Sequence, residues 1–145
     1  KADPAGRYAR IAHDELDRLP SGLGGPFDVV ACNFSLFNDD LAPSLRAMRR
    51  QLSANGTLII QTVHPWAAAG DRPYSDEWRT EDFTAFSLDT EGIKWTPMPW
   101  YFRTLQSWID VLVSAGMSVT RMREPIDPVS GRPLSIIFCC QASTS

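Results

Sequence analysis

Side chains that can bind ligands or move protons stand directly after two apolar runs of this sequence. Asn33 ends the first run and Phe34 and Ser35 follow it, while His64 follows the second run. Asparagine both donates and accepts hydrogen bonds, while histidine takes up or releases a proton near neutral pH. We therefore interpret Asn33 to Ser35 as candidate ligand contacts and His64 as a candidate general base. The alternatives are a capped strand end for the first group and a simple backbone hydrogen bond for His64, which precedes a proline.

A second group of candidate residues is aromatic and basic. Trp66, Trp100 and Tyr101 can exclude water from a bound ligand and can attract a cation through their ring faces. Arg103 can bind a carboxylate through paired hydrogen bonds. The same residues can instead attach a surface segment to its domain, with Arg103 paired to an acidic side chain. Both interpretations are consistent with the sequence.

The composition indicates a single globular domain and limits its partners. The chain has 145 residues, of which 43% are apolar and 21% are charged, and its formal net charge is -3. An acidic chain has no general attraction for nucleic acid or for anionic membrane surfaces. No apolar run reaches the roughly 20 residues that a transmembrane helix needs, and the beginning of the chain is polar, unlike a signal peptide. These features predict a soluble, cytoplasmic protein that binds neither nucleic acid nor membranes.

The three cysteines are poorly placed for a disulfide or a metal site. Cys139 and Cys140 are adjacent inside an apolar run, and no zinc-ligand spacing occurs. We expect buried, reduced thiols and no bound metal.

A strand-helix-strand unit is expected to position the first group of candidates. Residues 26–33 form a continuous apolar run behind a Gly-Gly-Pro turn, which predicts a central parallel strand buried on both faces. Apolar residues recur at helical spacing over residues 41–52, and the Asn-Gly pair at 55–56 is expected to end that helix. Residues 57–63 predict a second buried strand, joined to the first by a right-handed crossover.

The rest of the chain predicts an irregular insertion followed by a helix and two strands. Residues 64–102 carry four of the five tryptophans without clear periodicity, which predicts an inserted cap. A helix is expected over residues 104–115, and strands are expected over 117–122 and 134–141. The short connection between these two strands favours an antiparallel pair. Near the N-terminus, residues 7–11 are too short to assign firmly by pattern, and we take them as a further strand.

This order of elements resembles the second half of the class I S-adenosylmethionine-dependent methyltransferase fold, over nearly the whole chain. Residues 27–36 are similar to the fourth strand of that family and its exit loop. Residues 52–60 are similar to the leucine-x-proline-glycine-glycine turn into strand five, with Ala54 and Asn55 in place of the usual proline and glycine. Asparagine tolerates the left-handed conformation that such turns require, so the departure is small.

Two further motifs resemble a bacterial subgroup of small methyltransferases that carry a substrate cap. They are Gln-Thr-Val-His-Pro-Trp at residues 61–66 and Trp-Tyr-Phe-Arg-Thr-Leu at residues 100–105. The resemblance implies an α/β, Rossmann-like methyltransferase sheet of parallel strands, with an antiparallel terminal strand pair and a cap inserted at residues 64–102. It also implies that residues 1–145 form a partial methyltransferase domain, because the family's glycine-rich first motif is not among them.

The resemblance implies S-adenosylmethionine as cofactor and methyl transfer to an unidentified small molecule as activity. Ligands of open α/β sheets bind outside the carboxyl ends of the strands, where the candidate residues stand. The assigned roles are cofactor contacts for Asn33, Phe34 and Ser35, a catalytic base at His64, and acceptor contacts for Trp66, Trp100, Tyr101 and Arg103. His13 and Asp14, after the expected strand at residues 7–11, match adenine contacts of the family; a solvated turn is the alternative there.

Several functional outcomes are compatible with this sequence. We expect the chain by itself to be weakly active or inactive, because half of the family's cofactor site is not in it. The unpaired edge of the first apolar strand predicts a homodimer or another form of self-association. The two alternatives to an enzyme of this kind are a non-catalytic binding or interaction domain of the same fold and a nicotinamide-dependent Rossmann oxidoreductase.

Overall fold

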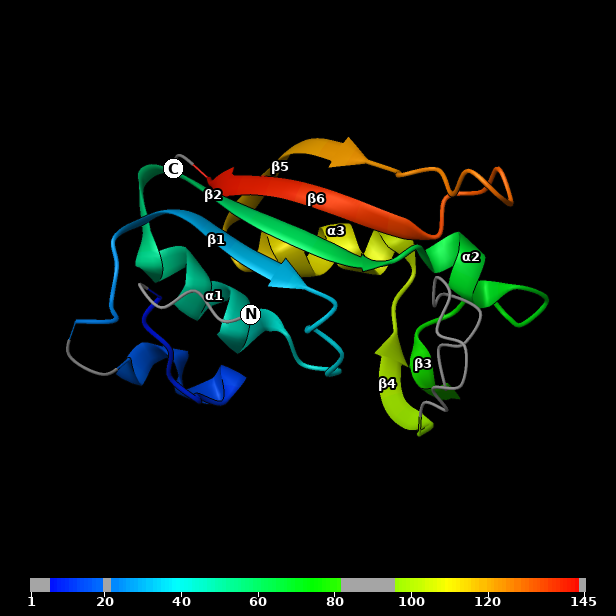
Figure 1. Ribbon diagram of the computed structural model, residues 1–145, viewed down its shortest axis with the longest axis horizontal. Helices are drawn as coiled ribbons and strands as arrows, with labels where there is room; N and C mark the ends of the chain where they lie inside the picture. The colour runs from blue at the N-terminus through cyan, green and yellow to red at the C-terminus, as the bar shows by residue number, and fades with distance from the viewer. Residues whose placement is uncertain (1–5, 20–21, 82–95, 144–145) are drawn as a thin grey trace.

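Four strands form the main sheet of the computed structural model, which describes residues 6–19, 22–81 and 96–143 of the chain (Figure 1). In spatial order they are β1 (Phe27–Asn33), β2 (Leu52–Val63), β6 (Ser135–Ala142) and β5 (Met117–Arg123). β1 and β2 are parallel, whereas β6 runs antiparallel to both β2 and β5. The predicted α/β sheet with an antiparallel terminal pair is therefore confirmed.

Two helices cover one face of this sheet. α1 (Ala42–Gln51) and α3 (Leu105–Ser114) lie on the same side of it, and the short 3-10 helix η1 (His13–Arg18) packs against α1 (Figure 1). Alternate residues of β2 and β6 are buried beneath the helices, while most of the residues between them are only half-buried. This alternation arises because no described helix packs on the opposite face.

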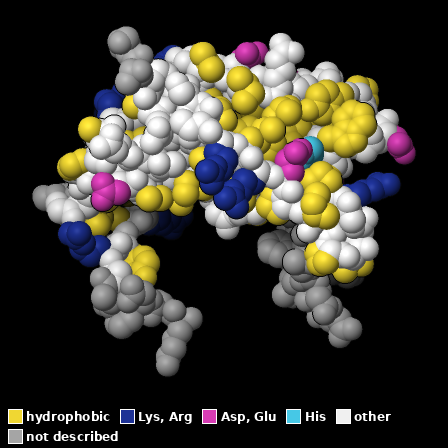
Figure 2. Space-filling view, turned by 90° about the horizontal axis from the view of Figure 1, so that it is seen from above, with side chains coloured by type: hydrophobic (Ala, Val, Ile, Leu, Met, Phe, Trp, Pro, Cys, Tyr) yellow, Lys and Arg dark blue, Asp and Glu magenta, His cyan; other side chains and the backbone are white. Residues whose placement is uncertain are grey.

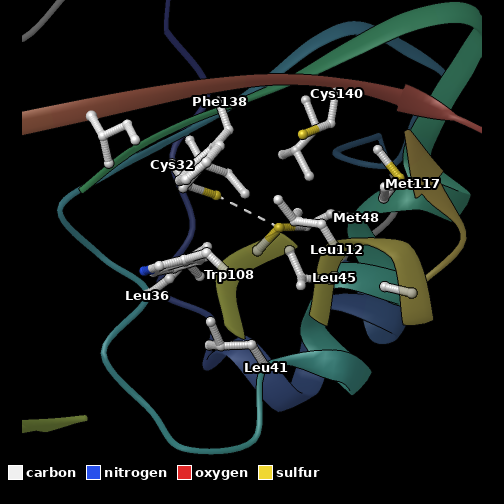
Figure 3. Close-up of a cluster of buried hydrophobic side chains, with 14 residues drawn as sticks. Cys32, Leu36, Leu41, Leu45, Met48, Trp108, Leu112, Met117, Phe138 and Cys140 are labelled. Carbon is white, nitrogen blue, oxygen red and sulfur yellow. Dashed lines mark hydrogen bonds between the residues drawn. The ribbon is translucent and has the colours of Figure 1, made fainter. Parts of the chain in front are cut away.

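The core between the helices and the sheet is apolar. Figure 3 shows Leu45 and Met48 of α1 grouped with Leu112 of α3 beneath Phe138 of β6. Leu45, Leu112 and Phe138 are 0% exposed. The Cys32 thiol donates to the Met48 sulfur, which lies 3.6 Å away. Removing side chains of this size from water is the main stabilising contribution in such a fold.

All three cysteines are free thiols. Cys32 and Cys140 are buried in this core, and Cys139 is half-buried. Burial raises the pKa of both buried thiols, that of Cys140 to about 12, so neither is ionised near neutral pH.

β1 is not buried on both faces. Val29 is 57% exposed, and among the described strands only β2 pairs with β1. The prediction of a central, fully buried strand is therefore wrong for the described part of the chain, since a second neighbour and a second helical layer are not found there. The predicted strand at residues 7–11 is also wrong, because these residues pair with no described strand and have no regular secondary structure.

The first helix ends earlier than predicted. α1 ends at Gln51, so the Asn55-Gly56 pair lies within β2 and does not terminate the helix. The pairing of β2 with β1 shifts at this point. A Cβ atom on Gly56 would lie 2.7 Å from the Phe27 carbonyl oxygen, so the close approach of the two backbones at this irregularity requires glycine.

The ends of α3 agree with the prediction. Thr104 Oγ1 accepts a hydrogen bond from the Ser107 backbone nitrogen at 3.1 Å and caps the first turn. Gly116 follows the helix with a φ of 77°, in the left-handed region that favours glycine. None of the described helices combines the length and the apolar character that crossing a bilayer requires.

The segment at residues 64–102 contains a short helix and a two-stranded ribbon. α2 (Pro65–Ala69) is followed by β3 (Glu77–Glu81) and β4 (Met98–Phe102), which pair with each other outside the main sheet (Figure 1). A second, smaller core holds the segment together; its buried members are Val63, Ala68, Ala69, Trp100 and Phe102. Residues 82–95 of the predicted cap lie outside the described residues. That this segment covers a substrate stays a prediction.

Replacing Leu112 with alanine should lower the free energy of unfolding by about 2–5 kcal/mol, because the fully buried side chain leaves a cavity behind. Val113, the next residue of α3, is 60% exposed, and Val113→Ala should change the free energy by less than about 0.5 kcal/mol. Urea unfolding followed by circular dichroism measures both values. Similar losses in the two variants would contradict the packing of α3 on the sheet.

Candidate functional site

The carboxyl ends of three strands meet at one edge of the main sheet. β1, β2 and β5 run in the same direction, because β6 is antiparallel to both β2 and β5. Asn33 ends β1, His64 follows β2 and Glu124 follows β5. Ligands of open α/β sheets bind outside an edge of this kind. We call the residues at these three strand exits the carboxyl-edge site.

The exit of β1 is a strained turn that exposes two of the predicted cofactor contacts. Phe34 has a φ of 45°, a left-handed conformation that bulky residues rarely adopt, and its side chain is 40% exposed. Its backbone nitrogen donates to the Gln61 carbonyl oxygen at 2.9 Å, which ties the turn to β2. Asn33 is exposed beside it. Strain of this kind is concentrated at functional sites, so the turn is a candidate ligand contact.

Ser35 is less available to a ligand than its two neighbours. It is half-buried, and its side chain hydrogen-bonds to the Cys32 thiol. Burial raises the pKa of that thiol, and the hydrogen bond from Ser35 offsets part of the rise. This hydrogen bond engages the Ser35 hydroxyl with the core, and the contact of Ser35 with the cofactor stays a prediction.

His64 is held at the exit of β2 by contacts on several sides. Its backbone nitrogen donates to the Leu134 carbonyl oxygen at 2.9 Å, and its carbonyl oxygen accepts from Ala68 at 2.9 Å. His64 as a whole is 7% exposed, and its ring nitrogen Nε2 lies 2.8 Å from Glu124 Oε1. Its Nδ1 is buried, and no described residue offers that atom a hydrogen bond. The ring is therefore fixed at one nitrogen and unsatisfied at the other.

The neighbourhood of this pair is largely apolar. Figure 2 shows a histidine and a carboxylate side by side, bordered by apolar side chains, on the face seen from above. Trp66 is 71% exposed and Ile126 is 58% exposed, and each is two residues from a member of the pair. Exposed apolar groups beside a buried polar atom are typical of a small-molecule site.

The structure separates the three predicted aromatic acceptor contacts. Trp100 is 4% exposed and belongs to the second core, where its ring meets the edge of Phe37 at a centroid distance of 6.1 Å. Tyr101 is half-buried on the same strand. Trp66, on α2, contacts Tyr74 at 5.8 Å and is mostly exposed. Of the three, Trp66 has the largest surface free for a ligand.

Arg103 is almost completely enclosed, with 3% of its surface exposed. Its Nη2 donates to the Asp39 carbonyl oxygen, and the guanidinium lies 4.8 Å from the Tyr101 ring centroid and 5.6 Å from that of Trp108. Burial lowers the pKa of Arg103, and the carboxylate of Asp76 opposes this shift. Its Nη1 has no partner among the described residues. The side chain joins the exit loop of β1 to β4, and one nitrogen is left for a further acceptor.

The predicted adenine contacts lie at the start of η1. The His13 carbonyl oxygen accepts a hydrogen bond from Ser44 Oγ at 3.3 Å, in the first turn of α1. Among the described residues no hydrogen bond joins His13 to the exit of β1. The side chain of Asp14 lies outside the described residues. The role of both in adenine binding stays a prediction.

Glu124 is a site residue that was not predicted from the sequence. The strand order would have indicated it. β6 is antiparallel to both β2 and β5, so β2 and β5 are parallel and their carboxyl ends lie at the same edge of the sheet. A carboxylate directly after β5 is therefore a neighbour of the residue directly after β2. In the part of the chain that the structure describes, no cluster of three histidine, cysteine or acidic side chains can hold a metal ion.

Arg103→Lys should lower the free energy of unfolding by about 1–3 kcal/mol, because lysine keeps the charge but loses the planar stacking and the fixed hydrogen bond to Asp39. Arg72→Lys is the matched control. The Arg72 side chain is 47% exposed and pairs with Glu81, so its replacement should cost less than about 1 kcal/mol. Urea unfolding with near-ultraviolet circular dichroism measures both. Equal losses would contradict a buried, structural guanidinium at Arg103.

The chain is related in sequence to a longer protein. No family model matches it. An uncharacterised protein of Haemophilus influenzae is 27% identical over an alignment of 134 residues, and the match covers 84% of this chain and 52% of that protein. The chain thus spans about half the length of this relative.

Solved structures of methyltransferases share its fold. A Listeria monocytogenes protein, provisionally assigned as an S-adenosylmethionine-dependent methyltransferase, has a TM-score of 0.70 at 16% identity, over 99% of this chain and 72% of that one. An S-adenosylmethionine-dependent methyltransferase of Mesorhizobium loti has a TM-score of 0.54 at 18% identity, over 86% and 66%. The 1,6-didemethyltoxoflavin N1-methyltransferase of Burkholderia thailandensis, with S-adenosylhomocysteine bound, has a TM-score of 0.59 at 11% identity, over 89% and 48%. The chain therefore has the class I S-adenosylmethionine-dependent methyltransferase fold.

Proposed function

We propose that this chain is the acceptor-side part of an enzyme that transfers a methyl group from S-adenosylmethionine to a small molecule. The observation that carries the proposal is the carboxyl-edge site. There a strained, exposed turn at Asn33 and Phe34 lies on the same sheet edge as a buried histidine with an unsatisfied ring nitrogen. In this fold that edge is where ligands bind.

The exit of β1 is the proposed contact for the methionine portion of the cofactor. The Asn33 amide is exposed and can both donate and accept hydrogen bonds to the amino and carboxylate groups. Phe34 presents an apolar ring beside it, which can cover the cofactor from solvent. Ser35 completes the turn, and the adenine contacts at His13 and Asp14 belong to the same proposal. S-adenosylhomocysteine bound to the Burkholderia enzyme supports this cofactor by likeness of fold.

His64 is the proposed base. S-adenosylmethionine supplies an electrophilic methyl group when it is bound, and an acceptor that attacks through an O–H or N–H group loses that proton as it gains the methyl group. An enclosed imidazole with a free nitrogen can take the proton, a role that is worth about 10²- to 10⁴-fold in rate. Holding the reacting groups in line and away from water is the larger part of catalysis in transfers of this kind.

The acceptor is proposed to lie against the segment at residues 64–102. Trp66 offers an exposed aromatic face two residues along the chain from His64, whereas Trp100 and Arg103 are buried and Tyr101 is half-buried. In this arrangement Trp66 contacts the acceptor, and Arg103 acts through its unsatisfied Nη1 if the acceptor carries an acidic group. The free cysteines favour a reducing location, and we propose the cytoplasm.

Calorimetric titration of S-adenosylmethionine tests the proposal, in this chain and in a longer version that carries the N-terminal segment expected from the fold. The longer version should bind the cofactor. Asn33→Ala should weaken binding about tenfold, the loss of one charge-assisted hydrogen bond, whereas His64→Ala should change binding less than about twofold. The rate of turnover should show the reverse order, with a larger loss in His64→Ala than in Asn33→Ala.

Asn55→Ala is the control for this titration, because Asn55 is exposed at the opposite end of β2 and should leave binding unchanged. Absence of cofactor binding by the longer version would contradict the enzyme proposal and favour a non-catalytic domain of the same fold. Binding of a nicotinamide dinucleotide in its place would favour an oxidoreductase.

We also propose that this chain associates with a second copy along the free edge of β1. Val29 is 57% exposed, and no described strand pairs with that edge. Sedimentation velocity should show a dimer or larger species for the 145-residue chain. Val29→Lys should shift the population toward monomer, because a charged side chain on a strand edge opposes pairing, while Val113→Lys on α3 serves as control. A monomer at all concentrations would contradict the proposal.

A further inference from the structure

We infer that Glu124 is a positioning residue: it fixes the ring proton of His64 on Nε2, leaves Nδ1 as the base, and thereby selects acceptors that attack through a hydroxyl or an N–H group. The inference rests on the proposed function, since it refines the role of His64. It adds a residue and a substrate class that follow from the geometry of one hydrogen bond and one unsatisfied atom.

The first step is the direction of the hydrogen bond between the two side chains. His64 Nε2 lies 2.8 Å from Glu124 Oε1, a normal distance for a charge-assisted hydrogen bond. An ionised carboxylate can only accept, so Nε2 must be the donor. A neutral imidazole carries one ring proton, which places the lone pair on Nδ1. Glu124 thus selects the tautomer, in the way that an acidic residue orients the histidine of a catalytic triad.

The second step is the state of Nδ1. The His64 side chain is 8% exposed, and its Nδ1 is buried without a partner among the described residues. A buried acceptor without a donor is unfavourable, and such atoms in native structures call for an explanation. A donor brought by a ligand would remove this cost. The atom is therefore suited to a hydroxyl or an N–H group of the acceptor, which reaches it when the side chains that cover Nδ1 move aside on binding.

The third step is the fate of the proton. As the acceptor's heteroatom forms its new bond to the methyl carbon, the bond between that carbon and the sulfonium sulfur of the donor would break, and S-adenosylhomocysteine would leave with the electron pair. The acceptor's O–H or N–H bond would break as well, and its proton would move to Nδ1. The ring then carries protons on both nitrogens and a positive charge, which lies against the Glu124 carboxylate. That carboxylate stabilises the imidazolium without becoming protonated itself. An acceptor with no exchangeable proton would gain nothing from this arrangement.

The fourth step is the surface around the pair. The Glu124 side chain is 48% exposed, and apolar side chains border the histidine and the carboxylate in Figure 2. Trp66 and Ile126, each two residues along the chain from a member of the pair, are exposed apolar residues. Apolar surface beside one buried polar atom favours an acceptor that is largely apolar and carries a single hydroxyl or amine at the reacting position. Thioethers and fully substituted amines do not fit this description.

The tautomer of His64 can be measured directly by two-dimensional ¹⁵N NMR of the imidazole nitrogens, at a pH where the ring is neutral. The wild-type chain should show His64 protonated on Nε2. Glu124→Gln should give a mixture of the two tautomers, because an amide can either donate to or accept from Nε2. Glu15→Gln, at an exposed position on η1, should match the wild type.

Two outcomes would overturn the inference: a wild-type ring protonated on Nδ1, or the same tautomer population in Glu124→Gln as in the wild type. The wild-type spectrum alone is decisive if the variant does not fold. The measurement needs no cofactor, so a failure of the proposed function appears separately as absent S-adenosylmethionine binding. In an active longer version, Glu124→Gln should lower kcat about 10- to 100-fold for a hydroxyl or amine acceptor while leaving cofactor binding unchanged.

Discussion

The common direction of β1, β2 and β5 is the constraint on which the candidate site depends. Parallel pairing of β1 with β2 brings Asn33 and Gln61 opposite each other, so both strands end at one edge. β6 returns antiparallel beside β2, and the Leu134 carbonyl, just before β6, accepts from the His64 backbone. β5 then ends at the same edge and delivers Glu124. A shift of any ladder by one residue would turn these side chains to the other face.

Local patterns were sufficient to predict most elements, because each depends on burial that is periodic along the chain. The apolar spacing of α3 and its stop at Gly116 hold in the structure. The strand expected at residues 7–11 was wrong for the opposite reason: a strand needs a partner, and a pattern does not say whether one is present. Likewise, a continuous apolar run predicted a β1 buried on both faces, but the described chain covers one face alone.

The positions of the site residues could be predicted, but their contacts could not. The backbone of a strand places the residue at its end on the sheet edge, whatever contacts the side chain makes. Asn33 and His64 could therefore be found from the sequence. Trp66 and Trp100 have the same chemistry, yet one is 71% exposed and the other 4%, because β4 turns Trp100 into the second core. The partner of His64, Glu124, is 60 residues away in the sequence. Its position beside His64 depends on the register of the β5–β6 ladder, which shifts between Val119 and Arg121.

Buried cations link the ribbon to the rest of the structure, and this decides how firmly the site is held. Arg79 is 5% exposed, donates to the carbonyl oxygens of Ala68 and Pro73, and lies 3.6 Å from the Phe102 ring centroid. Arg103 joins β4 to the loop after β1. A buried charge is stable only while its partners stay in place, so both guanidiniums oppose rearrangement of the chain around them. Arg79, through the carbonyl of Ala68 on α2, therefore helps to fix the chain that follows His64. The pairing of His64 with Glu124 depends on β2, β5 and β6.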